Sequence, residues 1–334
     1  MTGSVLVTGA AGFVGRHLVA ALLRRGEKVR ALDLSFEPEL PGAECIVGSV
    51  TDPDGVAEAL AGIEFVFHCA ANPQLWSSDP QAFTRVNVEG TRIVLETARR
   101  LGVKRAVHVS SFVTLMAKRL AGQTVDEQVK LQPADMLGPY PLSKYLSERL
   151  ALDLAGDGFQ VVAALPSAPI GPLDYKMTPP TKLIRDLVRG RVPATLKCRM
   201  NVIDVRMLAD GLIAARDRGR SGERYLLTGE DLSMAAFLET LASVSGVRMP
   251  KRTVPGYVAL TAALIDEKLV ARVTGKRPAA PLSGVQLAAT NIRFDNSRAR
   301  SELGLNTGST REALQDALTW MQAEGLLRRH AGNA

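Results

Sequence analysis

Cysteine and histidine are scarce in this chain of 334 residues, which has three cysteines and four histidines. Cys45, Cys69 and Cys198 lie far apart and form no C-x-x-C pair, so neither a disulfide framework nor a zinc site is expected. The histidines show no metal-ligand spacing either. We therefore expect reduced thiols, a reducing compartment and no metal site.

Long apolar runs are also absent. The most apolar stretch, residues 257–265, stops at Asp266, whereas a membrane-spanning helix needs roughly 18 such residues. The first residues carry no positively charged segment and no cleavage site, and they lead straight into a glycine motif. These features predict a cytoplasmic protein with no integral membrane span.

Aromatic residues make up only 5% of the chain, and its net charge of +7 comes from basic residues mixed with acids along the whole sequence. Binding of single-stranded nucleic acid typically needs basic residues beside stacking aromatics. We therefore expect no nucleic-acid partner, and a small-molecule substrate instead. A hydrophobic content of 46% indicates a globular chain, long enough for one large α/β domain or two unequal ones.

What the chain does contain is a regular alternation of apolar runs and helical patterns. Apolar runs predict strands at residues 4–8, 28–33, 44–47, 64–70, 105–110 and 160–165. Helical spacing marks residues 13–25, 52–61, 79–101 and 141–155, with Asp52 as a candidate N-cap. Nearly continuous apolar strands separated by helices predict an α/β fold with a Rossmann-type, doubly wound parallel sheet covered on both faces.

A glycine motif, TGAAGFVG at residues 8–15, follows the first strand and opens the first helix. Its glycines allow a tight turn, close approach of the backbone to a pyrophosphate, and close helix–strand packing. Asp33 ends the second strand, where a carboxylate accepts hydrogen bonds from ribose hydroxyls and repels a 2′-phosphate. NAD is therefore favoured over NADP, although Arg16 and Arg30 keep NADP open as an alternative.

The pattern changes after Pro166. Residues 166–180 contain five prolines, which predicts a loop or lid without regular structure. Further helices are expected at 181–190, 206–217, 233–245, 256–274 and 310–326, with a short strand at 224–228. The predicted organisation is an NAD-binding Rossmann domain (1–166 with part of 195–215) and a smaller, mixed α/β region (mainly 167–334) that binds substrate.

Several motifs together carry a family resemblance. The glycines are spaced G-x-x-G-x-x-G, and they are accompanied by FHCAA at 67–71, NVEGT at 87–91, HVSS at 108–111 and YPLSK at 140–144. With these motifs the chain resembles the extended short-chain dehydrogenase/reductase superfamily, the NAD-dependent epimerases and dehydratases. Residues 75–91, 166–180 and 222–233 are most similar to the hopanoid-associated sugar epimerase group, itself similar to dihydroflavonol reductases and 3β-hydroxysteroid dehydrogenases.

The resemblance implies a set of site residues. Ser111, Tyr140 and Lys144 would be the catalytic group, and Asn87 would hold the central helix in place. It also implies a homodimer that pairs helices 79–101 and 141–155. The residues expected to bind the cofactor are Gly9, Ala11, Gly12, Phe13, Val14, Asp33, Ser49, Val50, Ala70, Ala71, Tyr140, Lys144, Pro166 and Ala168.

The chain departs from the family pattern at three places. Ser49 stands where an aspartate often contacts adenine, and Leu165 stands where an arginine commonly precedes Pro166. Asp204 and Arg206 occupy positions where a histidine and an aspartate are common. These changes leave the substrate open and do not touch the catalytic group.

Tyr140 and Lys144 lie four residues apart, which puts them on the same face of a helix. A free tyrosine, with a pKa of about 10, is a poor base at neutral pH. A neighbouring ammonium and the positively charged nicotinamide favour the phenolate, so we expect a lowered pKa for Tyr140. Ser111 is expected to donate to the substrate oxygen, with Thr114 as second choice. Tyr145 points about 100° away from Lys144 and is expected only to pack.

Other side chains carry weaker expectations. Trp76, after the fourth strand, and Tyr175 and Met177, in the proline-rich segment, are candidate substrate contacts, as is Thr114. His68 and His108 lie within apolar strands and are expected to be packed polar groups.

Three functions remain open at this stage. The first is a sugar epimerase, which returns the hydride to the other face of a transient ketone. The second is a dehydrogenase or reductase of a polycyclic or lipid alcohol; the apolar segment 256–265 would suit such a substrate, although we expect it to be ordinary core. The third, a non-catalytic NAD-binding sensor, fits poorly with the retained Tyr140–Lys144 pair.

Overall fold

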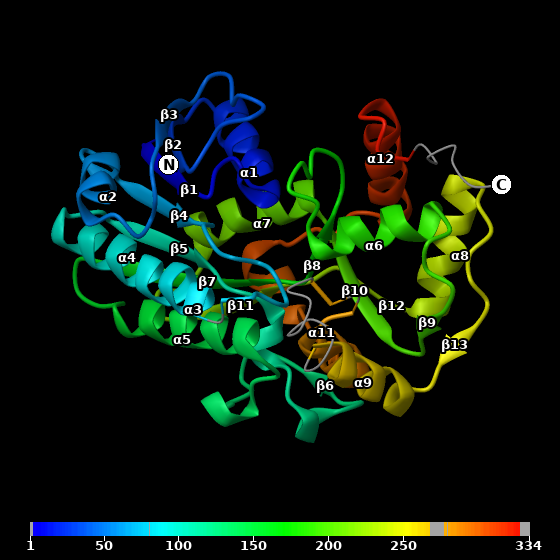
Figure 1. The fold of residues 1–334 in the computed structure, drawn as a ribbon. Coiled ribbons are helices and arrows are strands. Elements are labelled where there is room, and N and C mark those ends of the chain that lie inside the picture. The colour runs from blue at the N-terminus through cyan, green and yellow to red at the C-terminus, as the bar shows by residue number, and fades with distance from the viewer. Residues whose placement is uncertain (1–2, 80, 268–276, 279, 328–334) are drawn as a thin grey trace.

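The computed structural model describes residues 3–79, 81–267, 277–278 and 280–327. A seven-stranded sheet with strand order β11-β7-β5-β4-β1-β2-β3 forms the centre of the larger part of the molecule (Figure 1). All neighbouring strands in it run parallel. They are β1 (Ser4–Thr8), β2 (Lys28–Asp33), β3 (Glu44–Val47), β4 (Phe65–His68), β5 (Arg105–Val109), β7 (Gln160–Pro166) and β11 (Arg224–Leu227). The predicted Rossmann-type α/β fold is confirmed.

Helices cover both faces of this sheet, because its central strands are apolar on both sides. One apolar cluster joins one face to α1 and α7, and a second joins the other face to α2, α4 and α5. The bounds are α1 (Phe13–Arg24), α2 (Pro53–Leu60), α4 (Gly90–Arg100), α5 (Pro139–Asp153) and α7 (Val205–Arg218). A short helix, α3 (Gln81–Phe83), and a π-helix (Thr84–Glu89) lead into α4. Asp52 caps α2, as predicted.

The C-terminal half adds smaller sheets beside the large one. In a three-stranded mixed sheet, β10 pairs in parallel with β8 and antiparallel with β12. Its strands are β8 (Ala168–Ile170), β10 (Arg199–Asp204) and β12 (Glu230–Ser233). Two-residue strands form two further pairs, β9 (Thr195–Leu196) with β13 (Thr253–Val254) and β6 (Thr124–Val125) with β14 (Arg293–Phe294). The helices here are α6 (Pro179–Val188), α8 (Met234–Ser245), α9 (Gly256–Ile265), α11 (Leu282–Ala289) and α12 (Thr310–Ala323).

The prediction of a segment without regular structure at 166–180 is wrong at its two ends. β8 forms near its start and α6 begins at Pro179, while residues 171–178 between them form no helix or strand. β8 is held by β10, with Ala168 opposite Val202 and Ile170 opposite Asp204. Its proline is tolerated because β8 is an edge strand. β8 forms only because it pairs with β10, which is about 30 residues further along the chain. The proline-rich composition of the segment alone therefore predicts a loop.

The segment predicted as a helix at 256–274 begins as one, in α9, and residues 268–274 lie outside the described residues. The expectation that its apolar part is ordinary core is wrong, because Ala263 is the only buried residue of α9. Helix α11 was not predicted. Over the ranges described above, no helix is long and apolar enough to cross a bilayer, and no cluster of histidine, cysteine and acidic side chains is placed to hold a metal ion.

Candidate active site

The loop between β1 and α1 is built for close backbone packing. Gly9 has a positive φ of 67°, and a Cβ there would lie 2.7 Å from the Ala70 backbone. A Cβ on Gly15 would lie 2.2 Å from the Gly9 carbonyl oxygen. α1 begins at Phe13, and no side chain caps its N-terminus. The backbone N–H groups of its first turn are therefore available to an anion such as a pyrophosphate.

The predicted cofactor residues follow the ends of successive strands. Because the strands are parallel, their carboxyl ends meet at one edge of the sheet, where open α/β sheets bind ligands. Gly9 to Gly12 follow β1 and lead into Phe13 and Val14 of α1, and Asp33 ends β2. Ser49 and Val50 follow β3, Ala70 and Ala71 follow β4, and Pro166 ends β7 just before Ala168 of β8. Val50 is buried against Gly90 of α4. A side chain at position 90 would not fit, because its Cβ would lie 2.8 Å from Val50 Cγ2.

Asp33 lies at the end of β2 and faces the glycine loop. Its Oδ2 accepts a hydrogen bond from the Ala11 N–H at 2.9 Å, and its Oδ1 accepts one from the Leu34 N–H at 2.7 Å. The carboxylate is thereby held beside the loop and keeps further lone pairs for a ribose.

The two arginines that could have accommodated a 2′-phosphate are engaged elsewhere. Arg16 donates to the carbonyl oxygens of Pro38 and Glu39. Arg30 donates to the carbonyl oxygens of Ala59 and Ala61, and its Nε lies 3.0 Å from a Glu44 carboxylate oxygen. Both guanidinium groups therefore have structural partners.

Ser111, Tyr140 and Lys144 come together from two elements. Ser111 follows β5 and caps a 3₁₀ helix (Phe112–Leu115), and its side chain is hydrogen-bonded to Tyr140. Tyr140 is the second residue of α5, and Lys144 lies one turn further along the helix. The Lys144 ammonium is buried and donates to the Val109 carbonyl oxygen at 2.8 Å. The end of β5 thus holds both the serine and the lysine.

The electrostatics of Tyr140 differ from the expectation. Burial raises the pKa of its hydroxyl, and the hydrogen bond from Ser111 opposes that rise. The lowering expected from Lys144 is absent, and the ammonium instead hydrogen-bonds the Val109 carbonyl. For Lys144 itself, burial lowers the pKa to about 8, and the negative charge of Glu148 opposes this. The protein therefore holds Tyr140 as the protonated phenol.

Glu148 is a buried charged residue beside this group that sequence reasoning missed. It is buried, and its Oε2 accepts from Ser110 Oγ at 2.5 Å and from Thr114 Oγ1 at 2.9 Å. Its Oε1 accepts from Arg224 Nη1 at 3.3 Å. Glu148 follows Lys144 by four residues, as Lys144 follows Tyr140. This spacing puts all three on one face of the helix, and it could have indicated Glu148 from the sequence.

Asn87 ties the loop after β4 to the catalytic helix. Its Oδ1 accepts from the Asn72 N–H at 2.7 Å, and its Nδ2 donates to Ser143 Oγ at 2.8 Å. Ser143 in turn donates to the Tyr140 carbonyl oxygen at 2.8 Å. Tyr145, the other tyrosine of the motif, donates to the Leu131 carbonyl oxygen at 2.9 Å and packs in an apolar cluster.

The two strand histidines lie buried behind Lys144. His68 is hydrogen-bonded through Nδ1 to Thr8 Oγ1 at 2.8 Å and through Nε2 to Thr91 Oγ1 at 3.0 Å. Its ring stacks on that of His108, with centroids 5.6 Å apart. Burial, helped by the charge of Lys144, lowers the pKa of His68 to about 3 and that of His108 well below its usual value. Both rings are therefore neutral packed groups.

The four predicted substrate contacts lie in different surroundings. Thr114 is buried and its hydroxyl is committed to Glu148 and the Ser111 carbonyl, which corrects the expectation that it donates to substrate. Trp76 is half-buried in the loop after β4, and Met177 has a positive φ of 50° in the loop before α6.

Tyr175 instead joins two helices. Its ring lies edge-on to Trp320 of α12 with centroids 5.4 Å apart, and the Arg16 guanidinium of α1 lies 5.2 Å from its centroid. These contacts explain why Tyr175 is half-buried and give it a packing role. The sequence could not predict these partners, because Arg16 and Trp320 are each more than 140 residues from Tyr175 along the chain.

The surroundings of Tyr140 are largely apolar. Phe83 lies with its ring centroid 6.4 Å away, and Leu75, Phe112 and Met136 belong to the same apolar cluster as Tyr140. Helix α11 packs against the N-terminus of α5. Its Ser283 Oγ donates to the Leu137 carbonyl oxygen at 2.6 Å, and a Cβ on Gly138 would lie 2.7 Å from this Oγ, so only glycine fits at position 138.

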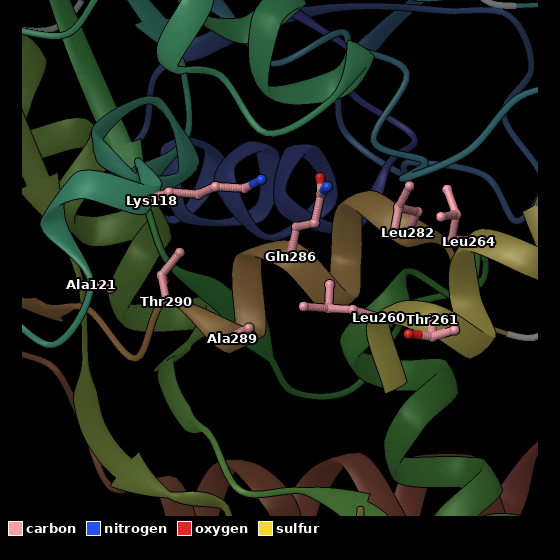
Figure 2. A pocket seen from close by; sticks show the side chains of 9 residues that line it. All are labelled: Lys118, Ala121, Leu260, Thr261, Leu264, Leu282, Gln286, Ala289 and Thr290. Atoms are coloured by element: carbon pink, nitrogen blue, oxygen red, sulfur yellow. The ribbon is translucent and has the colours of Figure 1, made fainter. Parts of the chain in front are cut away.

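A cavity of about 400 Å³ lies between α9, α11 and the 3₁₀ helix Lys118–Leu120 (Figure 2). Figure 2 shows Leu260 and Leu264 of α9 facing Leu282 and Gln286 of α11. Ser111, Tyr140 and Lys144 are not among its lining residues. This hollow is thus separate from Ser111, Tyr140 and Lys144.

Comparison with known proteins identifies relatives along almost the full chain. The model of the NAD dependent epimerase/dehydratase family matches residues 5–227. A "Putative dihydroflavonol 4-reductase" of Synechocystis sp. is 38% identical over 98% of this chain and 97% of its own. "Sterol demethylase protein B" of Methylococcus capsulatus is 34% identical over 97% and 100%. A 3β-hydroxysteroid dehydrogenase/Δ5→4-isomerase of Mycobacterium tuberculosis is 31% identical over 95% and 90%.

Solved structures show the same fold. The crystal structure of gox2253 has a TM-score of 0.85, 33% identity, and coverage of 98% of this chain and 100% of its own. The structure of MoeE5 in complex with UDP-glucose and NAD has a TM-score of 0.74 and 25% identity, covering 96% and 99%. The resemblance therefore extends over both the sheet and the C-terminal half.

Proposed function

Since the chain belongs to the NAD-dependent epimerase/dehydratase family, the extended short-chain dehydrogenases/reductases, we propose that it transfers hydride reversibly at a secondary alcohol or ketone carbon with Tyr140 as the acid–base. The chain is an NAD(P)-dependent enzyme of this family. The observation that carries the proposal is the convergence of Ser111, Tyr140 and Lys144 at the carboxyl end of β5. An NAD-binding sensor without turnover would have no use for this group.

The glycine loop fits the pyrophosphate of a dinucleotide. Gly9 and Gly15 leave room only for backbone, and the uncapped start of α1 presents N–H groups to an anion. Asp33 would hold the ribose, and the engagement of Arg16 and Arg30 favours NAD over NADP. When bound, the nicotinamide supplies the hydride donor or acceptor. Residues 1–166 with part of 195–215 would bind the cofactor, and residues 167–334 would mainly bind substrate.

The protein's own groups handle the proton. In the reduction direction, Tyr140 gives its phenolic proton to the oxygen that develops negative charge, and in oxidation it takes the proton back. Ser111 donates a hydrogen bond that steadies either the phenolate or the substrate oxygen. The Lys144 ammonium, fixed on Val109, offsets the negative charge left on Tyr140. The raised pKa of Tyr140 makes the acid role the resting state.

We propose an apolar polycyclic or lipid alcohol, or the matching ketone, as the substrate. Three of the relatives above 30% identity carry the names of a dihydroflavonol, a sterol and a steroid enzyme. The side chains around Tyr140 are mostly apolar. Three half-buried arginines that could contact a diphosphate are paired instead: Arg185 with Asp186, Arg199 with Asp231, and Arg206 with Asp204 and Asp316.

A sugar epimerase is the second candidate, supported by the likeness to MoeE5 in complex with UDP-glucose and NAD. The test presents the purified protein with NAD and a panel of sterols, flavanols and UDP-sugars. Reduced nicotinamide absorbance with a polycyclic alcohol is the expected result. Epimerised UDP-sugar with no net reduced cofactor would favour the epimerase, and no turnover with any compound would favour the sensor.

We also propose a homodimer that pairs helices of segments 79–101 and 141–155, which contain α4 and α5. Leu146 of α5 is exposed in the single subunit. This is expected of an apolar residue that a partner subunit covers. Native mass spectrometry gives the subunit number directly. A Leu146→Glu variant that remained dimeric would argue against pairing through α5.

A further inference from the structure

The outer side of α9 is apolar and exposed. Of the nine large apolar side chains that are exposed among the described residues, four belong to α9: Tyr257, Val258, Leu264 and Ile265. Their exposed fractions are 74%, 42%, 45% and 50%. Figure 1 shows α9 at the outer edge of the molecule, and α11 packs against its inner side. Concentrated exposure of this kind indicates an interaction surface, since scattered exposed leucines are ordinary.

Basic side chains border the N-terminal end of this helix. Arg248, Lys251 and Arg252 precede it along the chain and are exposed. Lys197 is exposed too, and it directly follows Leu196, which pairs with Val254 just before α9. No acid occurs between residues 247 and 265 or between residues 187 and 203. The border is therefore of one charge sign.

Two acids lie at the other end of α9, and both are half-buried. Glu267 is half-buried, and its Oε2 accepts a hydrogen bond from the Leu282 N–H at 2.9 Å, at the start of α11. Asp266 is also half-buried and has an interaction partner. We define the α9 surface by its apolar and basic members: Tyr257, Val258, Leu264, Ile265, Lys197, Arg248, Lys251 and Arg252.

We propose that the α9 surface docks the protein on an anionic phospholipid bilayer. An exposed apolar helix with a basic border suits the interface between water and lipid. Its apolar side chains enter the boundary between headgroups and acyl chains, while the basic side chains bind lipid phosphates. Tyr257 suits this depth, having an apolar ring and a polar tip. α9 has ten residues, so it lies along the interface and does not span it.

Other occupants fit this surface less well. A second copy of the chain with its α9 parallel would bring bases near bases. With its α9 antiparallel, the bases would meet the end of α9 where Glu267 already accepts from the Leu282 N–H. Nucleic acid would meet the bases but would leave Val258, Leu264 and Ile265 in water. Leu264 also lines the cavity of Figure 2, which gives the apolar part of the surface depth for an inserted acyl chain. The proposal does not depend on the substrate of the active site.

Co-sedimentation with vesicles tests the docking. The full-length protein is mixed with vesicles of phosphatidylcholine alone, or of phosphatidylcholine with anionic phosphatidylglycerol added. We expect binding to the anionic vesicles to be on the order of 10-fold stronger or more, and to weaken at high salt. No binding, or equal binding to both vesicles, would overturn the proposal.

Matched variants assign the binding to α9. Val258→Glu with Ile265→Glu should abolish it, and Val47→Glu, the same change at an exposed valine at the end of β3, should not. Lys251→Glu with Arg252→Glu should remove the preference for anionic lipid while leaving the apolar helix intact, so the idea stays testable should the first variant misfold. Wild-type binding by either α9 variant contradicts the proposal. So does a lipid-free dimer that Val258→Glu with Ile265→Glu dissociates, since the surface would then bind a second copy.

Discussion

Lys144 and Glu148 lie one turn apart on α5, and both side chains are buried. Burial lowers the pKa of the Lys144 ammonium, the Glu148 carboxylate opposes this, and the resulting pKa is about 8. The same carboxylate is held by Ser110, Thr114 and Arg224. A buried charge without a partner is costly, so Glu148 helps Lys144 to stay positive beside Tyr140. Tyr140, Lys144 and Glu148 thus share one face of α5, and Glu148 acts on the charge of Lys144.

Replacing Glu148 should move the pH dependence of the reaction. Lys144 is charged below its pKa of about 8 and loses its charge as the pH rises through that value. Glu148→Gln removes the charge that opposes the lowering, so the pKa of Lys144 falls further. We expect the alkaline limb of kcat/KM for ketone reduction to shift to lower pH. Thr114→Val is the control, because it removes one hydrogen bond to Glu148 and no charge; a shift of equal size there would contradict the electrostatic role.

Removing the phenol of Tyr140 should remove turnover. General acid–base catalysis contributes about 10²- to 10⁴-fold, so Tyr140→Phe should lower kcat by at least that order while NAD still binds by calorimetry. Tyr145→Phe is the matched control on the same helix, and it loses only the hydrogen bond to the Leu131 carbonyl. Its kcat should be nearly unchanged. A Tyr140→Phe enzyme with full activity would exclude Tyr140 as the acid–base.

Asp33 should govern the choice between NAD and NADP. Asp33→Ser removes an acceptor for the ribose hydroxyls and a charge that repels a 2′-phosphate. A charge-assisted hydrogen bond contributes about 1.5–3 kcal/mol, so KM for NAD should rise on the order of 10- to 100-fold. KM for NADP should fall. Glu64→Ser, which loses an ion pair with Lys104, should change neither value; if it changes both equally, the effect is not specific to Asp33.

The glycine loop should not tolerate a single added methyl group. In Gly15→Ala the new Cβ would lie 2.2 Å from the Gly9 carbonyl oxygen, so the loop must shift and NAD binding should be lost. Overpacking of this kind costs about 1–3 kcal/mol, which thermal unfolding would register as a lowered Tm. Gly156→Ala is the control, since its Cβ would meet no atom within 4 Å. Unchanged NAD affinity in Gly15→Ala would refute the fit of the loop to a pyrophosphate.

The large sheet and part of the site were predictable from local pattern. Apolar runs alternating with helical spacing predicted the parallel sheet, because both periodicities are properties of single segments. The glycine loop, the strand-end position of Asp33 and the one-turn spacing of Tyr140 and Lys144 are likewise local. The family resemblance added Ser111, which the structure places in hydrogen-bond contact with Tyr140.

Other features depend on residues that meet only in the folded chain. β8 exists because β10 lies beside it, and the ring of Tyr175 packs between α1 and α12. The raised pKa of Tyr140 could not be read from its spacing to Lys144, because burial by distant elements outweighs a neighbour along the helix. Short-range order follows from the chain itself, whereas burial, and with it charge state and exposure, follows from packing between segments far apart in sequence.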